Sequence, residues 1–199
     1  MTGLRAPVLY DIDAQLNVVP RLAAAMPTFS ENKKTVTIKL RTGIRFNDGT
    51  PFDAAAVNES LDRHRTLPRS ALASELAPVA SVETRGKDTL ILHLSSRYAP
   101  LTSQLADRAG MIMSPKALDD LGANFASNPV CVGPFMFKER VVGDHITLVK
   151  SPYYYDRSKA HLDSIVFKVI VDTAARSQNL RAHSIDVGLI RAAFAGFVK

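Results

Sequence analysis

The chain has 199 residues, enough for one large domain or two small lobes, and its hydrophobic share of 46% can supply a buried core. The formal net charge is +6, but the basic residues are scattered, which argues against a nucleic-acid-binding surface. The only cysteine, Cys131, excludes an intrachain disulfide and a multi-cysteine metal site. No stretch approaches membrane-spanning length, and the sequence is expected to carry no export signal.

The clearest local pattern is a strand followed by a tight turn. Apolar and polar residues alternate over residues 35–40, which predicts a half-buried strand. The sequence FNDGTPFD then predicts a turn, because Asp48 can bond its own backbone, Gly49 tolerates a positive φ and Pro51 fixes the exit. The chain is therefore expected to reverse directly after the strand.

A helix is expected to begin at Ala54. Asp53 is placed to cap its first turn, and Val57 and Leu61, four residues apart, would form its inward stripe. Asp48 and Asp53 are close enough in sequence to suggest paired carboxylates, but a turn and a helix cap are both structural uses of an acid. These two positions therefore do not indicate a catalytic pair.

Strands and helices are also predicted over the rest of the chain. The patterns predict a hairpin over 79–84 and 89–95, a short helix over 100–109, a helix that Ser114 caps and Gly122 ends, a strand pair over 133–141 and 145–150, a strand over 162–172, a helix over 173–182 and a short strand over 185–190. Strands dominate and nothing repeats internally. The fold class is therefore mixed α/β, with α+β character, rather than a sandwich or a helical bundle.

Residue types that carry chemistry do not cluster in the sequence. The five histidines are far apart, and none has the short spacing of metal ligands. Cys131 has no base in a recognisable motif beside it, which favours a packed loop thiol over a nucleophile. The sequence therefore predicts no metal, no cofactor and no enzymatic activity.

Two segments stay open between a structural and a ligand-binding role. The three tyrosines at 153–155 could stack on a ligand, although such a cluster after a strand more often packs in a core or between lobes. Residues 67–73 follow the helix that begins at Ala54 and are a candidate for the edge of a binding cleft.

Six sequence blocks occur in an order that is specific as a set. They are VVPRLAAAM, TVTIKLRTGIRFNDGTPFDAAAV, MIMSPKAL, NPVCVGPFMFKE, ITLVKSPYYYDRSKAHLDSIVFKVIVD and LRAHSIDVGLI. Together they resemble the family 5 extracellular solute-binding proteins, which are the oligopeptide, dipeptide and nickel receptors of ABC importers. The resemblance runs over residues 8–190.

This resemblance implies a partial, periplasmic-binding-protein-like class II fold with mixed sheets and flanking helices. Residues 1–30 would start the first lobe, 31–112 would form an inserted strand-rich subdomain, and 113–199 would continue the first lobe, with the second lobe absent. The implied function is the substrate-binding component of a peptide-type ABC importer, in a truncated form. It would pass a peptide or similar small solute to a membrane permease at the periplasmic or extracellular face. A ligand-sensing regulatory module of the same fold is the alternative.

The resemblance also implies roles for single residues. Scaffold positions of the family blocks are Phe46, Asp48, Gly49, Pro51, Gly133, Pro134 and Asp186. Candidate ligand contacts within the blocks are Asn128, Cys131, Gly133 and Tyr153. The chain departs from the family where a glycine-threonine-glycine-proline-aromatic loop reads CVGPF at 131–135, and where His183 replaces a glycine suited to a left-handed helix cap.

Overall fold

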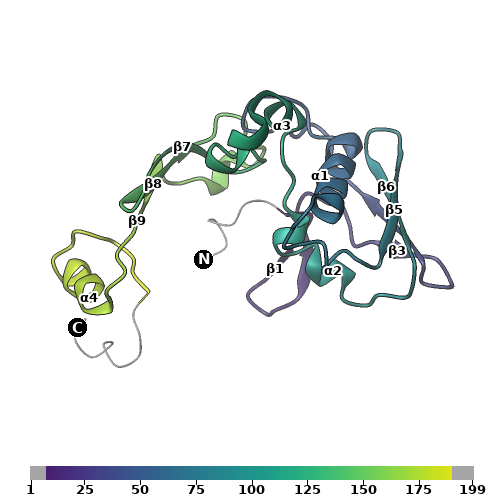
Figure 1. The fold of residues 1–199 in the computed structure, drawn as a ribbon, viewed down its shortest axis with the longest axis horizontal. Helices are drawn as coiled ribbons and strands as arrows, with labels where there is room; N and C mark the ends of the chain where they lie inside the picture. Colours follow the sequence, from purple (N-terminus) through teal and green to yellow (C-terminus); the bar gives the residue numbers. More distant parts are fainter. Residues whose placement is uncertain (1–7, 190–199) are drawn as a thin grey trace. The chain divides into compact units, whose positions relative to one another are not determined.

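The computed structural model describes residues 8–189. By packing, the chain divides into one unit formed by Met1–Phe137 with Val149–Ser164, and a second formed by Lys138–Leu148 with Ile165–Lys199 (Figure 1). This division does not test the expected lobe boundaries, 1–30, 31–112 and 113–199, which stay a prediction. Within the described part, no helix is long and apolar enough to cross a membrane.

The first unit contains a four-stranded antiparallel sheet. Its order is β3-β4-β6-β5, formed by Thr28–Phe29, Thr35–Lys39, Thr89–Leu94 and Val79–Arg85. Val36 pairs with Leu92 and Ile38 with Leu90, so the alternating apolar residues of both central strands meet on the buried side. The predicted strand over 35–40 and the hairpin that follows the first helix are both confirmed. A separate hairpin joins β1 (Tyr10–Ile12) to β2 (Val18–Pro20).

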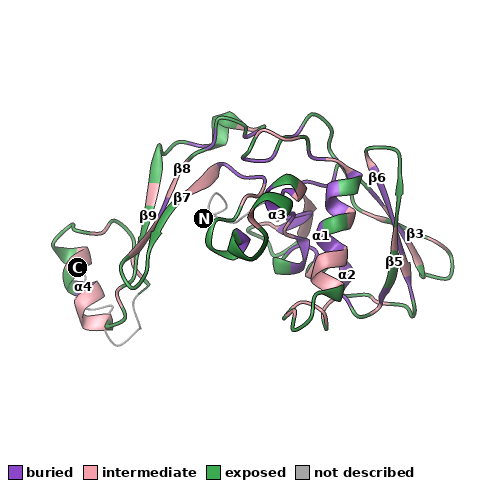
Figure 2. Ribbon diagram, turned by 45° about the horizontal axis from the view of Figure 1, so that its top comes forward, coloured by how far each residue is buried: buried purple, intermediate pink, exposed green. Residues whose placement is uncertain are grey.

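Helix α1 (Ala54–Thr66) packs against β5 and β6, and its buried residues show as purple on its inner side (Figure 2). Asp53 caps it as predicted, because its Oδ1 accepts a hydrogen bond from the backbone N of Ala56 at 3.1 Å. Val57 and Leu61 lie in the same buried cluster as the central strands. The strand, the turn and the capped helix therefore build one core.

The helix expected over 100–109 is shorter than predicted. It forms as α2 (Leu101–Gln104), followed by the 3₁₀ turn η1 (Arg108–Gly110). Tyr10 N donates to Leu105 O at 3.2 Å and Leu9 N donates to Gly110 O at 3.0 Å. The carbonyls of Leu105 and Gly110 thus accept hydrogen bonds from Leu9 and Tyr10 and do not continue a helix. Helix periodicity cannot reveal such a long-range contact.

Helix α3 (Pro115–Leu121) agrees with the prediction at both ends. Ser114 Oγ accepts a hydrogen bond from Ala117 N at 3.2 Å, and Gly122 ends the helix with a φ of +51°. The 3₁₀ segment η2 (Gly122–Ser127) follows it.

The remaining sheet has the order β7-β8-β9, formed by Phe135–Val141, His145–Lys150 and Ser164–Lys168. The first two strands were predicted, but β9 is shorter than the expected 162–172. The 3₁₀ turn η3 (Arg157–Lys159) precedes β9, and α4 (Thr173–Arg181) follows it as predicted.

The prediction of a strand over 185–190 is wrong for residues 185–189, which form no strand. Residue 190 lies outside the described residues. The chain turns sharply before this segment, because His183 has a φ of +54° and Ser184 N donates back to Asn179 O at 3.0 Å. His183 thus takes the left-handed cap position at which a glycine was expected. Apolar composition predicted a strand, but no strand within residues 8–189 pairs with these residues.

Candidate functional site

The turn after β4 is held together by its own backbone and by Asp48. Gly49 has a φ of +83° and its N donates to Phe46 O at 2.9 Å, while Asp48 Oδ1 accepts from Thr50 N at 2.9 Å. Arg45 and Pro51 face each other in an isolated β-bridge. The predicted roles of Asp48 and Gly49 in turn formation are therefore confirmed.

Asn47 connects this turn to two distant loops. Its backbone N donates to Cys131 O at 3.0 Å, and its Nδ2 donates to Phe135 O at 3.0 Å. Ser151 Oγ donates to Asn47 Oδ1 at 2.7 Å. Because Asn47 is buried, these bonds replace those that water would make, and the turn becomes an anchor for both loops.

Asp48 connects the same turn to helix α3. Ser114 Oγ donates to Asp48 Oδ2 while also capping the helix. Partial burial alone would raise the pKa of Asp48, but the hydrogen bonds from Ser114 and Thr50 outweigh it and lower this pKa below its ordinary value. The carboxylate therefore works as a structural acceptor, as the sequence indicated.

Two of the candidate ligand residues lie against this turn. A Cβ placed on Gly49 would be 3.2 Å from Cε1 of Tyr153, so the tyrosine ring covers the glycine. Cys131 pairs with Met113 in a β-bridge, and burial raises the pKa of its thiol to about 12. A thiol with this pKa is protonated at neutral pH, which agrees with a packed loop residue.

The other singled-out residues are dispersed. Gly133 and Pro134 are buried, and Pro134 O accepts from Ser151 N at 2.9 Å. Asn128 is exposed at the end of η2, and Asp186 is exposed in the second unit. The structure thus brings Cys131 and Tyr153 to the turn at Gly49 but gives no such contact to Asn128 or Asp186.

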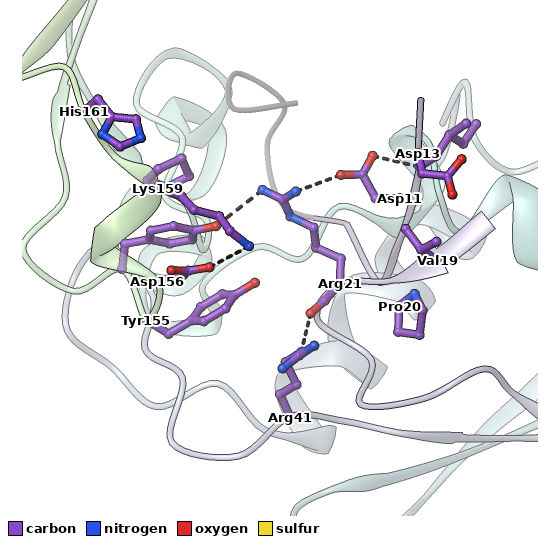
Figure 3. Close-up of a pocket in the computed structure, with 13 residues that line it drawn as sticks. Asp11, Asp13, Val19, Pro20, Arg21, Arg41, Tyr155, Asp156, Lys159 and His161 are labelled. Atoms are coloured by element: carbon purple, nitrogen blue, oxygen red, sulfur yellow. Dashed lines mark hydrogen bonds and ion pairs between the residues drawn. The ribbon is translucent and has the colours of Figure 1, made fainter. Parts of the chain in front are cut away.

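A pocket of about 710 Å³ opens in the first unit beside the β1–β2 hairpin (Figure 3). Its described lining residues are Asp11, Ile12, Asp13, Val19, Pro20, Arg21, Arg41, Pro134, Tyr154, Tyr155, Asp156, Lys159 and His161. We call it the hairpin pocket. Pro134 and the tyrosines were predicted from the sequence to matter, whereas the arginines and Asp13 carry no sequence signal that marks them.

Arg21 lies at the centre of the hairpin pocket. Its Nη1 forms an ion pair with Asp11 Oδ2 at 2.8 Å, and its Nη2 donates to Tyr154 Oη at 3.3 Å (Figure 3). Tyr154 is 4% exposed, and burial raises its pKa to about 12, against the lowering effect of Arg21. These contacts fix the arginine in place.

Two charges on the pocket wall have no oppositely charged partner among the described residues. Arg41 uses its Nε to donate to Arg21 O at 2.8 Å and has no carboxylate contact. Asp13 accepts only amide hydrogen bonds, from Gln15 and Asn17. Lys159, in contrast, is paired with Asp156 at 2.9 Å. The pocket therefore offers a guanidinium and a carboxylate that form no ion pair with any residue of 8–189.

Aromatic surface completes the lining. Tyr155 packs on Tyr154 with ring centroids 4.7 Å apart and remains partly exposed. Among residues 8–189, no group of three or more histidine, cysteine, aspartate or glutamate side chains could hold a metal ion. What the pocket presents to a solute is thus charge of both signs beside an aromatic ring.

Comparison with known proteins identifies the family of this chain. The family model described as bacterial extracellular solute-binding proteins, family 5 Middle, matches residues 17–198, so the chain belongs to this family. Proteins of this family bind solutes and are not enzymes.

Among curated relatives, the glutathione-binding protein GsiB of Salmonella paratyphi A is 30% identical over 174 residues, which is 87% of this chain and 34% of the relative. GsiB of Escherichia coli O157:H7 is 30% identical over 177 residues, with the same coverage. This chain therefore spans about a third of the length of these relatives.

Solved structures agree on the fold. AgaA of A. tumefaciens R10, in complex with agropinic acid, is 27% identical, with a TM-score of 0.83 over 90% of this chain and 36% of that one. NikZ of Campylobacter jejuni, in complex with Ni(L-His), has a TM-score of 0.85 at 22% identity over 96% of this chain and 39% of that one. The fold is thus a mixed α/β arrangement that matches part of the class II periplasmic binding proteins.

Proposed function

We propose that this chain is the substrate-binding component of a peptide-type ABC importer, working at the periplasmic or extracellular face with a membrane permease as its partner. The observation that carries the proposal is the family match over residues 17–198. The names of the relatives support the solute class, because they include glutathione, which is a tripeptide, and a peptide bound by OppA of Listeria monocytogenes.

The hairpin pocket fits the end groups of such a solute. A peptide carries a carboxylate and an ammonium group. The pocket presents Arg41 and Asp13, which have no oppositely charged partner in the part of the chain that the structure describes. Guanidinium binds carboxylate through paired hydrogen bonds, while a carboxylate accepts from an ammonium group. Tyr155 adds an apolar ring surface against which a side chain can pack.

A second group of contacts follows from the family blocks. Asn128, Cys131, Gly133 and Tyr153 stay predicted ligand contacts, and Tyr153→Ala serves as their representative in the binding experiment. Phe46, Asp48, Gly49, Pro51, Gly133, Pro134 and Asp186 stay the proposed scaffold.

Titration calorimetry with trialanine and glutathione tests the proposal. Because the chain spans about a third of its relatives' length and the pocket is open, we expect saturable binding that is weak, with a Kd of roughly 100 µM or above. Trialanine acetylated at its N-terminus and amidated at its C-terminus lacks both charges and should bind at least about tenfold more weakly.

Pocket variants locate the binding. Arg41→Gln and Asp13→Asn should each weaken trialanine binding about tenfold, because each leaves one end group of the peptide unpaired. Lys34→Gln and Glu31→Gln are matched controls, since they remove the same charges from exposed side chains outside the pocket. Absence of binding at millimolar peptide, or equal binding of the blocked peptide, would contradict the proposal. Loss of binding with Tyr153→Ala but not with Arg41→Gln would move the site to the turn at Gly49.

A further inference from the structure

The hairpin pocket is lined by two distant parts of the chain. One part is the β1–β2 hairpin and the residue after it, which we call the hairpin wall: Asp11, Ile12, Asp13, Val19, Pro20 and Arg21. The other part follows β8, and we call it the loop wall: Tyr154, Tyr155, Asp156, Lys159 and His161. Figure 3 shows Tyr155 and Asp156 on one side of the pocket and Asp13 and Val19 on the other.

A buried network holds the chain just before the loop wall. Ser151 and Asn47 are 3% and 8% exposed, and Ser151 Oγ donates to Asn47 Oδ1 at 2.7 Å. The same hydroxyl accepts from Tyr153 N at 3.2 Å, and Ser151 N donates to Pro134 O at 2.9 Å. Because buried hydrogen bonds are costly to break, these contacts fix the backbone from which the loop wall begins.

The aromatic rings of the loop wall depend on this anchor. Tyr154 follows Ser151 by three positions and is 4% exposed, with its Oη accepting from Arg21 Nη2 at 3.3 Å. Tyr155 packs on Tyr154 with ring centroids 4.7 Å apart. The position of the Tyr155 ring in the pocket is therefore set through Tyr154 and the backbone at Ser151.

The charges proposed to bind the ends of a peptide are held by other contacts. Arg41 Nε donates to the backbone oxygen of Arg21, and Asp13 accepts from Gln15 and Asn17. The network at Ser151 thus supports the aromatic side of the pocket, while the hairpin wall and its neighbour Arg41 hold the charged groups.

We propose that Asn47 and Ser151 are positioning residues that make the pocket prefer a peptide with an aromatic side chain between its two ends. They act by holding the Tyr155 ring where such a side chain packs against it. This inference rests on the proposed function and goes beyond it, because it names the side chain that the pocket selects and two residues outside the pocket lining that set the selection.

Calorimetry with three peptides separates the two sides of the pocket. The unaltered chain should bind alanyl-phenylalanyl-alanine about fivefold more tightly than trialanine. It should bind trialanine about tenfold more tightly than the doubly blocked peptide, as proposed above. In Ser151→Ala and in Asn47→Ala the first ratio should fall to about one, while the second ratio should stay about tenfold. A general loosening of the pocket would lower both ratios.

Ser60→Ala is the matched control. Ser60 is also a fully buried serine of the first unit, and its Oγ donates to Met113 O at 3.3 Å and accepts from Met113 N at 3.0 Å. The substitution therefore removes the same kind of hydroxyl and lowers the unfolding midpoint as Ser151→Ala does. Since Ser60 does not line the pocket, Ser60→Ala should keep both binding ratios.

A measurement without peptide tests the positioning by itself. In a ¹⁵N–¹H correlation spectrum, Asn47→Ala should shift the backbone amides of Tyr154 and Tyr155, although residue 47 is more than a hundred positions away in sequence. The amide of Asp13 should stay in place, and Ser60→Ala should move none of the three. Unshifted tyrosine amides in Asn47→Ala would overturn the positioning role.

The peptide results distinguish this inference from the proposed function. If the unaltered chain binds none of the peptides, the proposed function fails and the selectivity fails with it. If it binds trialanine but shows no preference for the phenylalanine peptide, or if Ser151→Ala keeps that preference, this inference alone is overturned. Loss of the preference in Ser60→Ala as well would also overturn it, because the effect would then follow from lowered stability.

Discussion

The ring of Tyr153 covers Gly49 so closely that a Cβ at residue 49 would lie 3.2 Å from the tyrosine Cε1. With its φ of +83°, Gly49 is thus restricted both by backbone conformation and by a side chain that follows it by about a hundred residues in sequence. This pair ties the turn after β4 to the loop after β8.

Gly49→Ala should therefore lower the free energy of unfolding by about 2–3 kcal/mol. Gly43→Ala is the control, because Gly43 has a φ of +74° but nothing within 4 Å of its added Cβ, and it should cost only about 1 kcal/mol. Urea unfolding followed by circular dichroism measures both. When Tyr153 is replaced by alanine, Gly49→Ala and Gly43→Ala should lower the free energy of unfolding by the same amount. If the two variants already cost the same with Tyr153 present, the contact between Tyr153 and Gly49 is disproved.

The Asp48–Ser114 hydrogen bond should appear as an energetic coupling between the turn and helix α3. Ser114→Ala also removes the cap on Ala117 N, so the single variants alone cannot isolate the bond. A double-mutant cycle of Asp48→Ala and Ser114→Ala should give a coupling of about 1–2 kcal/mol. Additive costs would show that the two residues act separately.

Two aspartates cap helices in the same way and can be compared. Asp53 accepts from Ala56 N at 3.1 Å in α1, and Asp172 accepts from Ala175 N at 2.7 Å in α4. Asp53→Ala should reduce stability by about 1 kcal/mol and lower the unfolding midpoint of the first unit, while Asp172→Ala should affect the second unit. Hydrogen exchange of each unit separates the effects. An Asp53→Ala effect confined to the second unit would contradict the packing described above.

His64 should make stability depend on pH near neutrality. Burial lowers its pKa, and this outweighs the opposing effect of the hydrogen bond to Met111 O at 3.0 Å. Since the unfolded chain then binds the proton more readily, stability should be full above the unfolded value of about 6.5 and fall as the pH drops below it. His64→Gln should flatten the stability profile between pH 7 and 5, whereas His161→Gln, which removes an exposed loop histidine, should retain the slope. An unchanged profile in His64→Gln would remove His64 as the cause.

Local chemistry explains which parts of the fold could be predicted. Caps at Asp53 and Ser114, the positive φ at Gly49 and the alternation in β4 and β6 depend on neighbouring residues, so the sequence shows them directly. The shortened helix after Pro100 depends instead on backbone bonds to Leu9 and Tyr10, and periodicity contains no sign of them.

The candidate site was predictable only in part for the same reason. The turn motif was visible in the sequence, but the role of Asn47 in joining it to distant segments was not. Its hydrogen bonds reach residues 131, 135 and 151, which are 84 to 104 positions away in sequence. In the hairpin pocket, Arg41 and Asp13 look like ordinary surface residues in sequence. Only the fold shows that they line one cavity and that no described residue of opposite charge pairs with them.

The most direct test of solute binding by this chain is a ¹⁵N–¹H correlation spectrum recorded during titration with trialanine. We expect saturable shifts of the backbone amides of Asp13, Arg21, Arg41 and Tyr155, with one common Kd, and their loss in Arg41→Gln. Saturable shifts confined to Asn128, Cys131 and Tyr153, or no shifts at several millimolar peptide, would contradict the hairpin pocket as the place where the solute binds.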